Sequence, residues 1–172
     1  LVNFIYDKNK SKAFYDWNKK SFNFNFFEKL TNSNFYYEGY INFNPFYSVF
    51  KGSTNKINLS NFFDSNSLST QLFKTEILNN KNLNIDLNIS ANKIAQYQNF
   101  VDIFLNFKIK QGLIDIDKTT FSWKNFVDSE ISDSLIYVNE NQLILDGKLI
   151  INIKDYNEIY KFLQISKNSR PK

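Results

Sequence analysis

Apolar and polar residues alternate with a period of two along much of the second half of the chain. The runs 83–91, 101–109 and 143–153 place an apolar residue, or once a glycine, at every second position, with mostly Asn, Asp, Ser or Lys between. Successive side chains of a β-strand point to opposite faces, so each run predicts a strand with one apolar face and one mostly polar face. Several such strands in series predict an antiparallel sheet with one broad apolar surface.

The same pattern, weaker, occurs in the first half of the chain. Phe22, Phe24 and Phe26 alternate with polar residues, and the run 37–43 repeats the period before Pro45. The strands expected after residue 80 are 83–91, 100–110, 113–124, 131–138 and 142–154, with turns at 111–112 and 139–141. The fold class is therefore mainly β, with a few short helices.

Two helices are expected where the period of two is interrupted. Ser67 is a suitable N-cap for an amphipathic helix over 68–78. Asp155, followed by Glu158 three positions later, has the spacing of a capping box and predicts a second helix over 156–163. Both helices are short compared with the sheet that they would have to cover.

We expect the chain to be one segment of a longer protein, because its 172 residues contain no Met. The segment divides into N-terminal strands (1–58), a helix (59–80), an antiparallel meander (81–154), a short helix (155–165) and a basic tail (166–172). No apolar run reaches the 18 residues or so that a membrane-spanning helix needs, so any membrane anchor would lie outside this segment.

The composition leaves few routes to catalysis. The absence of Cys and His excludes thiolate or imidazole metal sites and His-dependent triads from this segment, so we expect no metal, no cofactor and no enzyme activity. Asp115 and Asp117 could form a carboxylate pair, but Lys118 follows directly and a solvated strand face is the better interpretation. Arg170 is the one Arg among 21 basic residues, which argues against nucleic-acid binding.

The abundant Phe residues carry little information one by one. Asn, Lys, Ile, Phe and Tyr share A/T-rich codons, so base drift across a genome explains the 19 Phe. We therefore base the candidate site on alternation and not on aromatic content.

The broad apolar surface is the candidate site, because a sheet face of this kind has to be covered. One possibility is a closed core, in which the two helices cover the sheet. The other is an open groove that holds a hydrophobic ligand, favoured because two short helices are small beside five to eight strands. The residues expected to line such a groove are Leu83, Ile85, Leu87, Ile89, Val101, Ile103, Leu105, Phe107, Leu143, Leu145, Leu149 and Ile151.

Three segments resemble AsmA-like proteins, the family that includes TamB and YhdP. The segment 143–149, which contains Asp146-Gly147 and leads into a strand and a short amphipathic helix, is similar to the C-terminal pattern of that family. The segments 87–94 and 110–116 resemble its recurrent strands. The similarity covers about residues 36–170.

The resemblance implies a fold and a function. AsmA-like proteins are envelope proteins of Gram-negative bacteria, held in the inner membrane by an N-terminal helix and extending through the periplasm. Their curved sheets form a groove with an apolar lining, like a taco or half-barrel, and they are implicated in intermembrane phospholipid transport and outer-membrane biogenesis. The family has no catalytic residues to transfer.

For this chain the resemblance implies a periplasmic segment that binds phospholipid acyl chains. It also implies inner-membrane attachment through sequence outside the segment, and possible partners among other envelope proteins. Two alternatives stay open: a structural or adhesive cell-surface β-protein with a closed core, and an enzyme that uses Asp115 and Asp117.

Overall fold

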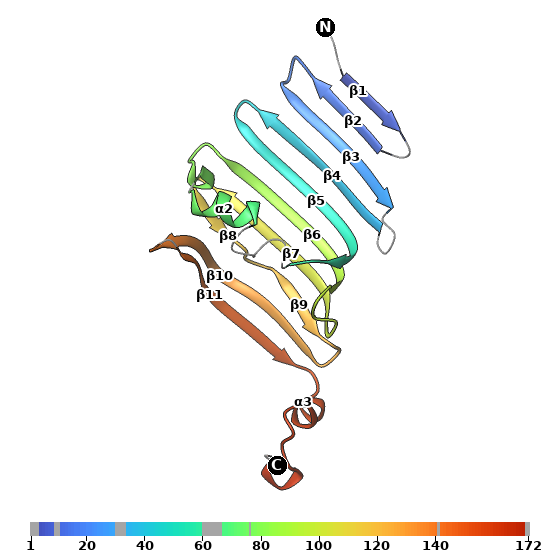
Figure 1. Cartoon of the computed structure of the whole chain (residues 1–172), viewed down its shortest axis with the longest axis vertical. Helices are drawn as coiled ribbons and strands as arrows, with labels where there is room; N and C mark the ends of the chain where they lie inside the picture. Colours follow the sequence, from blue (N-terminus) through green and yellow to red (C-terminus); the bar gives the residue numbers. More distant parts are fainter. Residues whose placement is uncertain are drawn as a thin grey trace.

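The computed structural model of the chain describes residues 4–8, 11–29, 34–59, 67–75, 77–140 and 142–170. They form one curved β-sheet with short helices (Figure 1). The strands are β1 (Phe4–Lys8), β2 (Ser11–Asp16), β3 (Ser21–Lys29), β4 (Asn34–Phe43), β5 (Phe46–Ile57), β6 (Asn84–Ile94), β7 (Phe100–Lys110), β8 (Leu113–Asp115), β9 (Thr120–Trp123), β10 (Val127–Asn139) and β11 (Gln142–Ile153). The helices are α2 (Leu68–Lys74) and α3 (Tyr156–Phe162), with single 3₁₀ turns η1 (Ile77–Asn79) and η2 (Lys167–Ser169).

The strands follow one another across the sheet almost in chain order. The order is β1 to β8, then β10 and β11, with β9 pairing with both β7 and β10. Among the described strand pairs, β5–β6 is parallel and the others are antiparallel. The predicted mainly β fold with a curved sheet is therefore confirmed, and the sheet is mixed because the chain between β5 and β6 passes through α2 and η1 before it pairs again.

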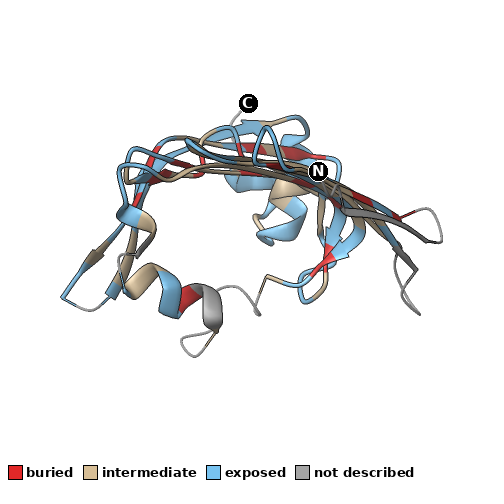
Figure 2. Cartoon of the chain, turned by 90° about the horizontal axis from the view of Figure 1, so that it is seen from above, coloured by how far each residue is buried: buried red, intermediate tan, exposed pale blue. Residues whose placement is uncertain are grey.

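The sheet is curved and open. Figure 2 views it from one end as an arch, with α2 beneath the arch on the concave side. The aromatic ring of Phe73 on α2 packs edge-on against Phe107 of β7, with 5.8 Å between ring centroids. We call the face that carries Phe107 the concave face and the opposite one the convex face.

Both helices begin at the predicted N-caps. The Ser67 hydroxyl accepts the backbone N–H of Thr70 at 3.1 Å, and the Asp155 carboxylate accepts the N–H groups of Asn157 and Glu158 at 2.9 and 3.1 Å. Each helix is shorter than the sequence predicts. The α-helix of α2 ends at Lys74, and its last predicted turn is the 3₁₀ turn η1.

The predicted strand 113–124 is divided into β8 and β9. Between them the chain leaves the ladder, and Lys118 has a positive φ of 63°. The Asp117 carboxylate accepts the N–H and the hydroxyl of Ser134, at 2.7 and 2.6 Å, while the Ser134 hydroxyl accepts the N–H of Ile116 at 2.9 Å. These bonds replace the missing ladder bonds next to a β-bulge in β10, where the register shifts between Ser132 and Leu135.

The buried core consists of two apolar clusters on the concave face. One joins β5, β6 and β7, and the other joins β7, β8 and β10 with Ile116, which follows β8. The first contains Ile57, Ile89, Ala91, Ile94 and Ile103. The second contains Ile109, Ile114, Ile116 and Ile136. Both are small for a sheet of this width, because none of the described segments forms a second layer over much of the concave face.

Candidate functional site

The strand register aligns apolar residues across the whole sheet. On one line, Phe24 of β3 stands opposite Gly39, Gly39 opposite Phe50, Phe50 opposite Leu87, and Leu87 opposite Phe107. Residues directly opposite one another in a sheet point to the same face. The line therefore forms an uninterrupted apolar strip from β3 to β7.

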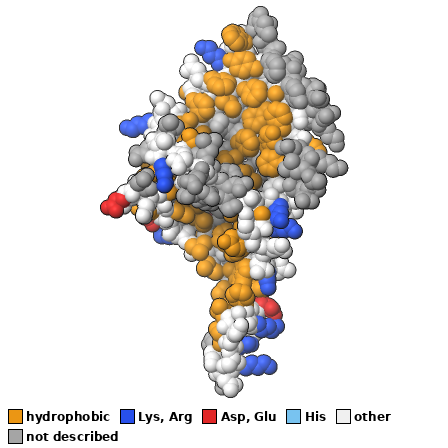
Figure 3. All heavy atoms as spheres, in the orientation of Figure 1, with side chains coloured by type: hydrophobic (Ala, Val, Ile, Leu, Met, Phe, Trp, Pro, Cys, Tyr) orange, Lys and Arg blue, Asp and Glu red, His pale blue; other side chains and the backbone are white. Residues whose placement is uncertain are grey.

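A second line continues this strip to the far edge. Ile85 stands opposite Ile109, Ile109 opposite Ile114, Ile114 opposite Ile136, and Ile136 opposite Leu145 of β11. Figure 3 views the concave face and shows apolar side chains along the length of the molecule, with Lys and Arg at the margins. With strands about 4.8 Å apart, the ten-strand path spans roughly 45 Å.

The N-terminal half of the concave face is aromatic. Tyr37 lies at its centre and stacks on Phe50 at 5.8 Å with 12° between the ring planes. Phe26 and Phe35 lie 5.3 and 5.0 Å from the same Tyr37 ring. These rings are half-buried and nothing in the described chain forms a second layer on them, so they present a firm apolar floor.

A close approach between Phe24 and Gly39 shapes this floor. A Cβ atom added to Gly39 would lie 2.4 Å from Cζ of Phe24 and 2.8 Å from the carbonyl oxygen of Val49. The Phe24 ring therefore lies directly over the glycine, an arrangement that fills the space a strand glycine leaves empty.

The middle of the concave face is partly covered. Besides Phe73 of α2, Leu78 of η1 packs against the second core cluster. Leu83, Ile85 and Phe107 pack there as well, so they are shielded from solvent by the chain itself. This part agrees with the closed-core alternative over a limited area.

The C-terminal edge is open. On β11, Leu145, Leu149 and Ile151 are 53%, 54% and 56% exposed, although all three lie on the concave face. Next to them the ring of Trp123 meets Phe162 of α3 edge-on at 4.2 Å. Large aliphatic side chains with half their surface in water are the clearest sign that the concave face is not an ordinary core.

Most of the residues predicted to line a groove lie on the concave face. Ile89 and Ile103 belong to the first buried cluster, and Leu87 and Leu105 pack against it. Those packed against the second cluster are Leu83, Ile85, Phe107 and Leu143. Leu145, Leu149 and Ile151 form the exposed edge.

Val101 does not join this set. It stands opposite Lys93 on β6 and Ser122 on β9, at a point where Asp102 has a positive φ of 52° and the register with β9 shifts. The bulge interrupts the period of two there. The prediction assumed that alternation continued through Asp102.

The aromatic half of the concave face was not among the residues predicted to line a groove. The period of two in 22–26 and 37–43 is the signal in the sequence that points to it, although A/T-rich codons explain the Phe content as a whole. The additional concave residues are Phe22, Phe24, Phe26, Phe35, Tyr37 and Phe50.

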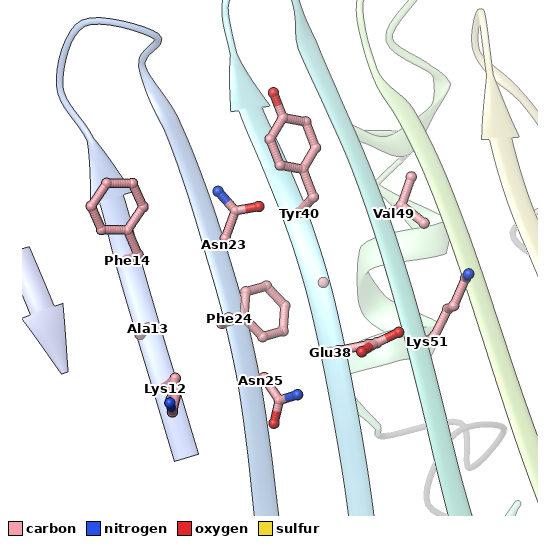
Figure 4. A pocket seen from close by; sticks show the side chains of 11 residues that line it. Lys12, Ala13, Phe14, Asn23, Phe24, Asn25, Glu38, Tyr40, Val49 and Lys51 are labelled. Atoms are coloured by element: carbon pink, nitrogen blue, oxygen red, sulfur yellow. The ribbon is translucent and has the colours of Figure 1, made fainter. Parts of the chain in front are cut away.

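The convex face mixes polar and apolar side chains. A depression of about 560 Å³ between β2 and β5 is lined by polar residues, among them Asn23, Glu38 and Lys51, and by the apolar side chains of Phe14 and Val49 (Figure 4). Next to it, Asn25 donates to the Tyr36 hydroxyl at 2.8 Å, and that hydroxyl donates to Glu38 at 2.7 Å. The bond to Glu38 raises the pKa of Tyr36, because it stabilises the protonated phenol.

Asp115 and Asp117 both accept hydrogen bonds from nearby residues of the chain. The Ser134 hydroxyl and N–H bind the Asp117 carboxylate and lower its pKa, whereas burial raises the pKa of Asp115. The Asp117 N–H donates to the Asp115 carboxylate at 3.2 Å. Both carboxylates thus accept backbone bonds that hold the segment between β8 and β9 in place.

No family model, curated protein or solved structure matches this chain. Within the described ranges, no helix is both long and apolar enough to cross a membrane. No group of three or more acidic side chains that could hold a metal ion was found among those same residues.

Proposed function

We propose that the concave face binds the acyl chains of phospholipids and that the chain is a lipid-handling segment of an AsmA-like periplasmic protein. The observation that carries the proposal is the unbroken apolar strip from β3 to β11, which ends in side chains more than half exposed on Leu145, Leu149 and Ile151. Alternation, curvature and the resemblance of the segment 143–149 to that family support the same function.

The dimensions of the face suit a lipid chain. One leaflet of a bilayer contributes about 15 Å to a hydrocarbon core of about 30 Å. The strip from β3 to β11 crosses seven intervals between neighbouring strands, roughly 34 Å, and is therefore long enough for an acyl chain to lie along it. Contact with an apolar surface is worth about 0.8 kcal/mol per buried CH₂ and requires no directional bonds, so a chain could bind firmly and still slide.

The charge distribution suits a phospholipid head group. The chain carries a formal net charge of +4, and Lys and Arg side chains lie at the margins of the apolar strip (Figure 3). A basic residue near an anionic lipid surface contributes roughly 1 kcal/mol. In this proposal the head groups stay in water at the open side of the arch. The protein would be periplasmic and held at the inner membrane of a Gram-negative bacterium by sequence outside this segment.

Two tyrosines on one strand give a matched test. Tyr37 lies on the concave face and Tyr40 on the convex face, and both are half-buried on β4. We expect the purified chain to retain phospholipid, detected by mass spectrometry of an organic extract, and to transfer a fluorescent phospholipid between vesicles. Tyr37→Asp should reduce both by roughly fivefold or more, because it places a charge on the apolar floor. Tyr40→Asp should leave both near the wild-type level.

Circular dichroism and urea unfolding must show that both variants are folded. A wild-type chain without bound or transferable phospholipid would refute the proposal, as would equal losses in the two variants. A wild-type chain without phospholipid is the result that the adhesive alternative predicts, since that alternative requires no lipid on either face.

A further inference from the structure

The edge strand β11 has a free side. In the part of the chain that the structure describes, β11 pairs with β10 and with no other strand. It is 12 residues long and contains no Pro, and its exposed apolar side chains lie on both faces, with Leu149 on the concave and Ile150 on the convex face. A long apolar edge strand of this kind is a template for another strand.

The ladder to β10 fixes which backbone groups of β11 point outward. The N–H of Lys154 donates to the carbonyl of Phe126 at 2.8 Å, in register with the pair Val127–Ile153. In an antiparallel ladder the residues that bond one neighbour alternate with those that face away. Even-numbered residues of β11 therefore bond β10, and the odd-numbered residues from Leu143 to Ile151 direct N–H and C=O outward.

The sequence of β11 is nearly palindromic in chemical type about Gly147. Positions equally distant on either side of this glycine carry matching or complementary residues. The pairs are Asp146 with Lys148, Leu145 with Leu149, Ile144 with Ile150, Leu143 with Ile151, and Gln142 with Asn152. If two identical strands pair antiparallel about Gly147, each residue therefore meets a residue of matching or complementary type on the other strand.

We propose that β11 pairs antiparallel with β11 of a second copy of this chain, about a two-fold axis at Gly147. In that register Leu145 meets the partner's Leu149, and Asp146 meets the partner's Lys148, twice by symmetry. Because Gly147 is odd-numbered, odd-numbered residues meet odd-numbered residues across the axis, and their backbone groups face outward from β10. Five such pairs with two bonds each give roughly ten new hydrogen bonds. Lys148 already pairs with Asp133 of its own chain at 2.7 Å, and both groups are largely exposed, so the partner's Asp146 would join this pair at the edge. The complementary charges favour a second copy over an unrelated strand.

This arrangement preserves the faces of the sheet. Opposite residues in an antiparallel pair share a face, so the two concave faces would join into one. The pairing rests on β11 alone and does not require that the concave face bind lipid. The two positions of the charge-exchange test, 146 and 148, lie on the convex face, so a failure of that test would leave the lipid proposal standing.

Charge exchange tests the pairing in solution. Asp146→Lys replaces two opposite-charge pairs by two like-charge pairs and should raise the dimer dissociation constant roughly tenfold or more in sedimentation velocity. Adding Lys148→Asp should restore dimerisation to within about threefold. Glu130→Lys makes the same charge change on β10, away from the edge, and should have no effect on dimerisation. A wild-type chain that stays monomeric at 200 µM, on the order of the highest practical concentration, would overturn the proposal.

The absence of Cys allows a direct test of register. Under mild oxidation, a mixture of Leu145→Cys and Leu149→Cys chains should form a disulfide-linked dimer, because these positions oppose one another across the axis. Each variant alone should stay unlinked, since its cysteines would be four residues out of register, roughly 13 Å apart. Equal linking in the separate variants, or species larger than a dimer, would overturn the two-fold pairing at Gly147.

Discussion

Replacement of two strand glycines by alanine should have different effects on stability. Gly39 and Gly52 lie on the concave face of neighbouring strands. A Cβ at Gly52 would lie 3.4 Å from Cζ of Phe35, close to an ordinary contact distance. At Gly39 it would lie 2.4 Å from Cζ of Phe24 and also meet the backbone at Val49. The first position has room for a methyl group and the second has none.

The expected magnitudes follow from these distances. Overpacking of a well-filled site costs about 1–3 kcal/mol, and strand glycine is itself less favourable than alanine by about 0.5–1 kcal/mol. Gly39→Ala should therefore lower the free energy of unfolding by about 1–2 kcal/mol. Gly52→Ala should leave it unchanged or raise it by about 0.5 kcal/mol. The Phe24 ring cannot move aside freely, because Phe22 and Phe50 lie 5.6 and 5.5 Å from it.

Urea unfolding followed by circular dichroism measures both effects, provided that the slope of free energy against urea is unchanged. A third variant, Gly39→Ala with Phe24→Leu, removes the ring that the methyl group meets. Its loss of stability should be smaller than the sum of the two single losses. Equal stability of Gly39→Ala and Gly52→Ala, or simple additivity in the double variant, would show that the ring does not lie over the glycine.

Two further predictions concern the bulge in β10. Ser134→Ala should lower the free energy of unfolding by about 1–3 kcal/mol in urea, since it leaves the buried N–H of Ile116 without its acceptor. Ser134→Thr keeps a hydroxyl and should recover part of this loss. The pKa of Asp117 is lowered in the folded state, so its contribution to stability is complete above its ordinary value of 3.8 and is lost as the pH falls through the folded-state pKa. The stability difference between wild type and Asp117→Asn should accordingly shrink below about pH 4, and a difference constant from pH 7 to pH 2.5 would contradict this role.

Alternation predicted the strands well because each face of this sheet has one chemical character. The strands 100–110 and 142–154 agree with β7 and β11 to within one residue. Alternation carries no information on strand direction, so the parallel pair β5–β6 was not predicted. It also does not reveal where a strand contains an extra residue, so the bulge at Asp133 and the displacement of Val101 were not predicted.

The candidate site was predicted in part for the same reason. The lining residues of β6, β7 and β11 were identified because aliphatic residues alternate there with polar ones. The aromatic floor around Tyr37 depends on the register between β3, β4 and β5, a long-range property that no single run reveals. The division of 113–124 into two strands depends on the bonds from Asp117 to Ser134, which lie 17 positions apart in the chain.

The parallel pairing of β5 with β6 has a consequence for anything that lies along the arch. A parallel pair cannot be joined by a tight hairpin, so the chain has to cross a face of the sheet to begin β6. Here the crossing segment includes α2, which lies on the concave face, in the hollow of the arch (Figure 2). The segment lies against β7, β10 and β11, over the aliphatic part of the hollow, and among the described residues it has no such contact with the ring-bearing strands β3 and β4. A molecule stretched from the rings to the aliphatic part would therefore have to pass Phe73.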